Sequence, residues 1–497
     1  MTLVRGIAGA AVALALLFSG NQLVGANSAS PGLTFTKVWT HSHVTPGQVS
    51  EIPAFDPLTN TIWVGGVVGV DVLDAGSGTL LKHIDVTAHG LVNSVAIHDG
   101  VAAFAVEAPS LSAACPSCDR RNPGKVLFYD TATRLPSGSV TEVTVGSLPD
   151  MLTFTHEGTK LLVANEATPN AAADLPYLAV DPPGSVSIID MATRTVVSTA
   201  TLNGLPMSGS HVRLPSSTGM DFEPEYIAVS RDDTKAYVAL QEANAIAVLD
   251  LVSNEFTEII GLGAKDFSVA GNEIDPKDND GVVLFRSVAA KGFYMPDGIT
   301  TYKWRGETYL VMANEGDFRE DNADRSAASS FGAVAPLDRL RVSNRDSSVG
   351  NLYAAGARSF SIRRTNGELV YDSGSILDRE AHKRGVYDDS RSRDKGVEPE
   401  GVALLQIGSR TYAFVGLERT TKASIAIFDV TDLEAVTFVD MIVTTGDLSP
   451  EGLAAYKYRG EYYLAIANEV PASGTTTCHT TLYRLASVDG AAHDDSE

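Results

Sequence analysis

Cysteine is scarce in this chain of 497 residues, which contains only three. Cys115 and Cys118 form a CPSC motif in a segment of small and polar residues, and Cys478 stands alone. A haem-attachment motif would need histidine after the second cysteine, but Asp119 follows it. A redox CxxC motif belongs in a βαβ context, which this sequence lacks. We therefore expect a local Cys115–Cys118 disulfide in an exported protein.

Basic residues and long apolar runs are also in short supply. The 38 lysines and arginines are outnumbered by 61 acids, which gives a net charge of −23. This sign argues against nucleic acid or an anionic membrane as a partner. One apolar run, IAGAAVALALLF, follows Arg5 and is too short to span a membrane. We expect a signal peptide over residues 1–26, no membrane insertion, and an exported protein that is periplasmic or extracellular.

Helical periodicity is almost absent, and short β-branched and aromatic runs recur between turn residues instead. Three stretches repeat one pattern: residues 296–315, 399–418 and 450–469. In each, an acid directly after proline is followed eighteen positions later by a glutamate. Two apolar runs joined by a turn lie between the two acids. This layout predicts a β-hairpin that recurs as a structural repeat.

Four further units fit the same template, beginning at Ser50, Val92, Leu148 and Glu223. Most units continue with a third apolar run that ends near an aspartate, and then with a more polar fourth run. Four antiparallel strands in a unit are typical of a propeller blade. The last unit lacks a fourth strand, and the strand predicted at Leu33–Trp39 would supply it.

We therefore predict an all-β fold over residues 27–497, a seven-bladed β-propeller whose ring is closed by the N-terminal strand in the last blade. Two charged insertions interrupt it, at about residues 316–357 and 375–396. Loops of this length are usually functional lids or disordered. The first insertion follows the second strand of its unit, which places it on the same face as the repeated acids.

The repeated acids should gather on one face of the propeller. Adjacent antiparallel strands run in opposite directions, so the start of the first and the end of the second share one sheet edge. The acids predicted around the central channel are Asp150, Glu166, Glu225, Glu242, Asp297, Glu315, Glu400, Glu418, Glu451 and Glu469, with Glu223 and Glu398 close by.

Such a ring of carboxylates cannot be fully charged without protons, arginines or cations among them. Calcium fits best because it takes six to eight oxygen ligands in flexible geometry, and magnesium or manganese are alternatives. Zinc would require histidine or cysteine, which the ring positions do not offer. A structural alternative is that each Pro-Glu-Gly is a strand-entry turn and that Arg319, Arg358, Arg393 and Arg419 neutralise the glutamates.

Several segments carry a family resemblance: ANEGDFRE, DDSRSRDKGVEPEGVALLQIGSRTYAFVGLER and LSPEGLAAYK. Together they resemble the choice-of-anchor I family, exported bacterial β-propellers of the YVTN type that are similar to mesenchyme-specific cell-surface glycoproteins. The resemblance implies the propeller fold and export. Some relatives carry the label alkaline phosphatase, which implies hydrolysis of phosphoric esters.

Two functions follow from these features. In the first, Glu315, Glu400 and Glu451 hold a metal that polarises a small phosphoester, and Arg319 or Arg419 clamps the phosphate. In the second, the protein is a non-catalytic propeller that calcium stabilises and that binds a surface ligand or a protein. In either case we expect a monomer.

Overall fold

The computed structural model describes residues 32–109, 118–168, 182–214, 222–318, 324–471 and 474–488. Strands dominate these ranges, and their one α-helix is α1 (Ile376–Lys383), so the predicted all-β fold is confirmed. No helix in the same ranges is long and apolar enough to cross a bilayer. The predicted signal peptide lies outside the described residues.

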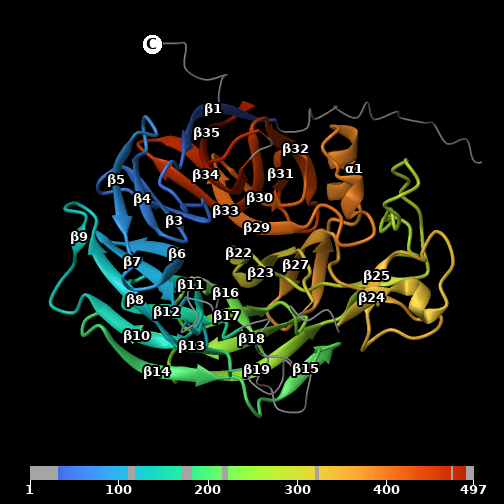
Figure 1. The fold of residues 1–497 in the computed structure, drawn as a ribbon, viewed down its shortest axis with the longest axis horizontal. Helices are drawn as coiled ribbons and strands as arrows, with labels where there is room; N and C mark the ends of the chain where they lie inside the picture. The colour runs from blue at the N-terminus through green and yellow to red at the C-terminus, as the bar shows by residue number, and fades with distance from the viewer. Residues whose placement is uncertain are drawn as a thin grey trace, which may run out of the picture.

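The described residues form seven large sheets, five with four strands and two with five, in the order of the predicted repeats (Figure 1). The first contains β2 (Ile52–Asp56), β3 (Thr61–Gly66), β4 (Gly69–Asp74) and β5 (Leu80–Asp85). The second contains β6 (Leu91–His98), β7 (Val101–Glu107), β8 (Pro123–Asp130), β9 (Leu135–Pro136) and β10 (Glu142–Ser147). The third contains β11 (Pro149–Phe154), β12 (Lys160–Asn165), β13 (Ser185–Asp190) and β14 (Thr195–Thr201).

The fourth sheet contains β15 (Met207–Ser210), β16 (Pro224–Val229), β17 (Lys235–Leu240), β18 (Ala245–Asp250) and β19 (Glu255–Leu262). The fifth contains β22 (Ile299–Trp304), β23 (Glu307–Asn314), β27 (Ser359–Arg364) and β28 (Leu369–Asp372). The sixth contains β29 (Pro399–Ile407), β30 (Arg410–Leu417), β31 (Ala423–Asp429) and β32 (Thr437–Thr444). The seventh contains β33 (Asp447–Tyr458), β34 (Glu461–Pro471), β35 (His479–Ser487) and β1 (Leu33–Ser42), where β1 pairs antiparallel with β35 as expected.

The sheets pack in chain order, and the last packs on the first. The innermost strand of each sheet contacts that of the next, in the order β2, β6, β11, β16, β22, β29 and β33, and β33 contacts β2. Most of these strands face the middle of the molecule in Figure 1. A hydrophobic cluster lies between neighbouring sheets. Between the last sheet and the first, for example, Trp39 and Leu482 pack with Ile62 and Val64.

The two insertions carry structure of their own. The described part of the first contains β24 (Arg325–Ala327), η2 (Ala328–Phe331), β25 (Arg341–Ser343) and β26 (Tyr353–Ala354). Strand β26 pairs with β21 (Lys291–Phe293), which also pairs with β20 (Ala264–Asp266). The second insertion contains α1 and η3 (Asp389–Arg391). A backbone hydrogen bond of 2.8 Å from Arg341 N to Arg393 O joins the two insertions.

Candidate metal centre

In two of its three copies, the Pro-acid-Gly motif begins the innermost strand of a sheet with a β-bulge. Register shifts interrupt the ladder of β29 between Pro399 and Val402, and that of β33 between Pro450 and Leu453. The acid of the motif lies inside each shift. Because a bulge re-aims the side chains that it contains, it directs these acids away from the regular alternation of the strand. The residue two positions before the acid is left-handed in both, with φ 50° at Glu398 and 48° at Ser449.

The glycine of the motif lets the neighbouring sheet approach closely. An added Cβ would lie 2.4 Å from the Glu451 carbonyl oxygen at Gly401, and 2.5 Å from that of Glu51 at Gly452. The Gly452 N–H donates a hydrogen bond of 2.9 Å to the Glu51 carbonyl. Only glycine tolerates such contacts. The motif therefore brings the acids of consecutive sheets side by side.

These acids line a cavity of about 230 Å³. Its carboxylate lining consists of Glu51, Asp150, Glu166, Glu225, Asp297, Glu315, Glu400, Glu451 and Glu469. All the ligands predicted from sequence line this cavity except Glu398 and Glu418. Those two still lie close by, because Glu315, Glu398 and Glu418 each have a carboxylate oxygen within 4.8 Å of the others.

The cavity wall also contains residues that the repeat pattern did not indicate. Glu51 and Asn93 hold the positions that the Pro-acid motif occupies in later units. In the fourth unit Gln241, rather than Glu242, lines the cavity, since Leu240 pairs with Pro224 as Asn165 pairs with Pro149. These positions are set by the pairing register of the strands, which cannot be read from the sequence of a weakly repeated unit.

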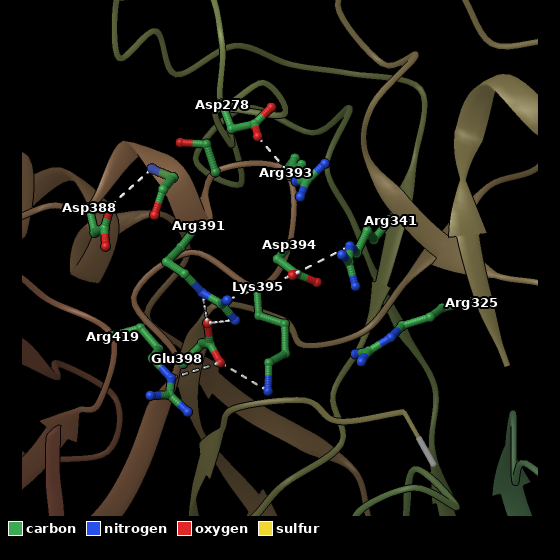
Figure 2. A network of polar contacts seen from close by, with 12 residues as sticks. Asp278, Arg325, Arg341, Asp388, Arg391, Arg393, Asp394, Lys395, Glu398 and Arg419 are labelled. Atoms are coloured by element: carbon green, nitrogen blue, oxygen red, sulfur yellow. Dashed lines mark hydrogen bonds and ion pairs between the residues drawn. The ribbon is translucent and has the colours of Figure 1, made fainter. Parts of the chain in front are cut away.

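Cations neutralise one side of the acidic cluster. The Lys395 Nζ atom forms ion pairs with Glu315 at 2.5 Å and Glu398 at 2.9 Å. Arg391 Nη2 pairs with Glu398 at 2.5 Å, and Arg419 Nη2 pairs with Glu418 at 2.7 Å. Figure 2 shows Lys395, Arg391 and Arg419 converging on Glu398. Basic residues therefore neutralise these carboxylates, as the structural alternative expected, but of the arginines it named Arg419 takes part, and Lys395 and Arg391 were not predicted.

The rest of the lining is compensated more weakly, since Arg120 acts on Asp150 and Glu166 only through longer-range attraction. In the described ranges, no lysine or arginine forms an ion pair with Glu225, Glu400 or Glu451. The Oε2 atoms of Glu51, Glu225 and Glu400 are buried without a hydrogen-bond donor. Glu400 is only 9% exposed, so little solvent reaches it. A buried carboxylate without a partner is costly unless it is protonated or binds a cation.

Burial raises the pKa of these acids, and their neighbours add to the effect. The pKa of Glu315 rises to about 8, against the opposing effect of Lys395. That of Asp150 rises to about 7, through burial and then Asp297. Burial also raises the pKa values of Glu400 and Glu451 well above their usual range, each with several neighbouring acids contributing. The cavity thus favours groups that offset negative charge, which are protons or cations.

Two overlapping groups of side chains have metal-ligand spacing, and each combines a carboxylate that has an ion-pair partner with others that have none. The first is Asp297, Glu315 and Glu400, and the second is Glu400, Glu418 and Glu451. Within each group the ligand oxygens all lie within 4.8 Å of one another. Glu400 belongs to both. Sets of carboxylate oxygens alone suit hard cations such as calcium, and magnesium or manganese less closely.

The arginines predicted from sequence have different positions. Arg419 is half-exposed beside Glu418, so its guanidinium borders the second group. Arg319 lies outside the described residues. Arg358 pairs with Asp378, and Arg393 pairs with Asp278, so neither neutralises the ring. Among the cysteines, Cys118 is disulfide-bonded, Cys478 is a free buried thiol, and Cys115 lies outside the described residues.

The fold and this cavity define an all-β repeat protein with a carboxylate-lined centre. The profile of the choice-of-anchor I domain matches residues 51–433. The chain therefore belongs to the choice-of-anchor I family, as its motifs predicted.

Curated relatives cover only parts of the chain. Gigasin-3a of Magallana gigas is 38% identical over 117 residues, which cover 19% of this chain and 41% of the relative. The mesenchyme-specific cell surface glycoprotein of Strongylocentrotus purpuratus is 25% identical over 312 residues, covering 49% of this chain and 39% of the relative. The chain thus spans about two fifths of each relative. Among solved structures, Kuenenia stuttgartiensis hydrazine synthase matches with 12% identity and a TM-score of 0.49, covering 87% of this chain and 97% of that one.

Proposed function

We propose that this protein is a seven-bladed β-propeller that binds a divalent cation, calcium before magnesium or manganese, in its central carboxylate-lined cavity. The cyclic contacts of the inner strands and the pairing of β1 with β35 support the closed ring. The N-terminal apolar run supports export to the periplasm or the extracellular space. The name of the sea-urchin relative, a cell-surface glycoprotein, agrees with export.

One observation carries the proposal. The Oε2 atom of Glu400 is buried without a hydrogen-bond donor, and Glu400 belongs to both groups with metal-ligand spacing. Lysine and arginine partners are available nearby, yet they pair with Glu315, Glu398 and Glu418 instead. A hard cation beside Glu400 would compensate the remaining carboxylates together, whereas protons would have to neutralise them one by one.

Thermal melting of the chelator-treated protein tests this proposal. Folded pKa values of about 7 for Asp150 and about 8 for Glu315 exceed the ordinary values of 3.8 and 4.5. The resulting stability is fully present below the ordinary values and is lost as the pH rises through the folded ones. We therefore expect the metal-free Tm to fall between about pH 5 and about pH 8.

Calcium should oppose this loss because it replaces the protons. At about a hundredfold excess over Kd, we expect calcium to raise the Tm by about 3–5 °C at about pH 8. The increase should shrink towards about pH 5, where protons compete for the same oxygens. Equal increases at both pH values, or none with any divalent cation, would contradict cation binding by these carboxylates.

Metal-dependent hydrolysis of phosphoric esters is the second candidate. Its support is the half-exposed Arg419 guanidinium, 2.7 Å from Glu418 and thus next to the group of Glu400, Glu418 and Glu451. A cation held there would polarise a phosphoryl oxygen, and the arginine would hold the remaining negative charge. Without hydrolysis, the same cation would serve a propeller that binds a surface ligand or a protein.

A phosphomonoester assay with added calcium or manganese separates the two candidates. If the protein hydrolyses phosphoric esters at this site, Arg419→Met should lower the turnover about a hundredfold. Calcium should still raise the Tm of this variant. If the protein shows no turnover with either metal but a calcium-dependent Tm, the binding protein is the correct candidate. If Arg419→Met leaves the turnover unchanged, Arg419 does not hold the phosphate.

A further inference from the structure

A histidine cluster lies away from the acidic cavity, where the first and last sheets meet. His41 is near the end of β1, His43 follows that strand, and Asp71 lies in β4. One potential ligand atom from each lies within 4.8 Å of the other two. His43 is 1% exposed and Asp71 is fully buried, whereas His41 is half-buried. The cluster therefore combines two buried side chains with one that is partly exposed at the surface.

Hydrogen bonds hold most of this cluster in place. The Asp71 carboxylate bonds to Nδ1 of His43 through Oδ2 and to Nδ1 of His83 through Oδ1, both at 2.7 Å. The other ring nitrogen of His43, Nε2, lies 2.8 Å from Thr480 Oγ1. Thr480 in turn bonds to Ser50 Oγ at 2.8 Å. These contacts fix the rings as outer partners commonly do around metal-binding histidines.

His41 is the member whose bonding is incomplete. Its ring forms one hydrogen bond with the Gly78 backbone. Its Nε2 atom is buried and has no hydrogen-bond partner. The ring lies 4.9 Å from that of His43 at an interplanar angle of 80°, so the two rings do not stack. A buried ring nitrogen without a partner is unfavourable unless it meets a ligand.

We propose that His41, His43 and Asp71 form a second metal site, selective for Zn²⁺ or a similar transition-metal ion rather than calcium. Two imidazole nitrogens and one carboxylate oxygen are a typical zinc donor set, with a fourth position open to water. Calcium prefers oxygen ligands only. The site is independent of the proposed function of the cavity, since it shares no residue with it.

The geometry needs only a small adjustment to admit the ion. His43 would donate from Nε2 to Thr480 Oγ1 and offer Nδ1 to the metal, which is a change of tautomer without loss of a proton. Zinc bond lengths place tetrahedral ligand atoms about 3.3 Å apart, so the 2.7 Å contact between His43 and Asp71 would widen by about half an ångström. His83 would remain bonded to the other Asp71 oxygen and orient it.

Such an ion would link the seventh sheet to the first. His41 belongs to β1 of the seventh sheet, and Asp71 belongs to β4 of the first. Because the unfolded chain does not hold these groups together, binding would stabilise the contact between the two sheets. We therefore expect zinc to raise the Tm even when the cavity carboxylates are altered.

Cobalt absorption tests the site, since Co²⁺ bound by nitrogen and oxygen at low coordination number absorbs visible light strongly. The whole chain, purified without a histidine tag and treated with chelator, should bind one equivalent of Co²⁺ with such a spectrum. Excess Zn²⁺ should abolish the spectrum, and excess Ca²⁺ should leave it unchanged. His41→Gln should weaken Co²⁺ binding by about tenfold or more.

Matched variants separate this site from the cavity. His98→Gln, at a half-buried histidine that contacts the His156 carbonyl, should bind Co²⁺ as the unaltered protein does. Glu400→Gln should also keep the cobalt spectrum, whatever it does to calcium binding. The proposal is overturned if the unaltered protein gives no strong cobalt spectrum, if calcium displaces cobalt, or if His41→Gln binds Co²⁺ normally. The first two outcomes do not depend on how well a variant folds.

Discussion

Replacing Lys395 with methionine should lower the free energy of unfolding of the metal-free protein by about 3–5 kcal/mol. Lys395 is 6% exposed and forms ion pairs with both Glu315 and Glu398. Its removal leaves two buried carboxylates to two arginines, Arg391 and the more distant Arg419, and to one amide, Gln241. Guanidinium denaturation of the two proteins at one pH measures the difference.

Lys303→Met is the matched control, because Lys303 is an exposed residue of β22 in the fifth sheet. We expect it to change stability by less than about 0.5 kcal/mol. If Lys395→Met were as mild as this control, Lys395 would not be the buried counter-charge of the acidic cluster. Calcium should restore part of the lost stability, because it supplies positive charge to the same carboxylates.

Replacing Glu400 with glutamine should have opposite effects on two measured quantities. Calcium affinity should fall by about tenfold or more, because Glu400 belongs to both candidate ligand groups. The metal-free protein should become more stable at about pH 8, because the variant removes a buried carboxyl that burial and its acidic neighbours disfavour in the charged form. Calorimetry measures the first effect, and melting in chelator measures the second.

Glu307→Gln provides the control for this pair of effects. Glu307 is exposed and begins β23, the strand that ends at Asn314 next to the cavity. The control should change neither calcium affinity nor the metal-free Tm. If Glu400→Gln binds calcium normally, Glu400 is not a calcium ligand. If the variant is less stable than the unaltered protein without metal, the Glu400 carboxylate does not carry an uncompensated charge.

Much of this architecture was predictable because each unit repeats its own local signals. The apolar alternation of residues 450–469 specifies β33 and β34, and the acids at both ends of that hairpin reach one cavity. Pairing of the N-terminal strand with β35 was also predictable, because the last unit lacked its fourth strand. These inferences depend on short-range pattern and strand direction alone.

Other parts of the site depend on contacts that no local pattern encodes. Glu51 follows serine rather than proline, so the motif did not reveal it, although it lies at the equivalent position, directly before β2, and lines the cavity. Lys395 comes from an insertion without a repeat, and its pairing with Glu315 depends on tertiary packing. The cluster of His41, His43 and Asp71 combines residues at β1 of the seventh sheet and β4 of the first. The packing of the last sheet on the first brings these residues together.

Calorimetric titration of the chelator-treated protein with calcium at about pH 8, in two buffers of different ionisation enthalpy, tests the central claim most directly. We predict saturable binding of at least one calcium ion, with protons released because carboxyls that hold them in the metal-free cavity give them up. The apparent heat should therefore differ between the two buffers, and Glu400→Gln should reduce both binding and proton release. Absence of saturable binding, or binding that Glu400→Gln leaves unchanged, would contradict the account.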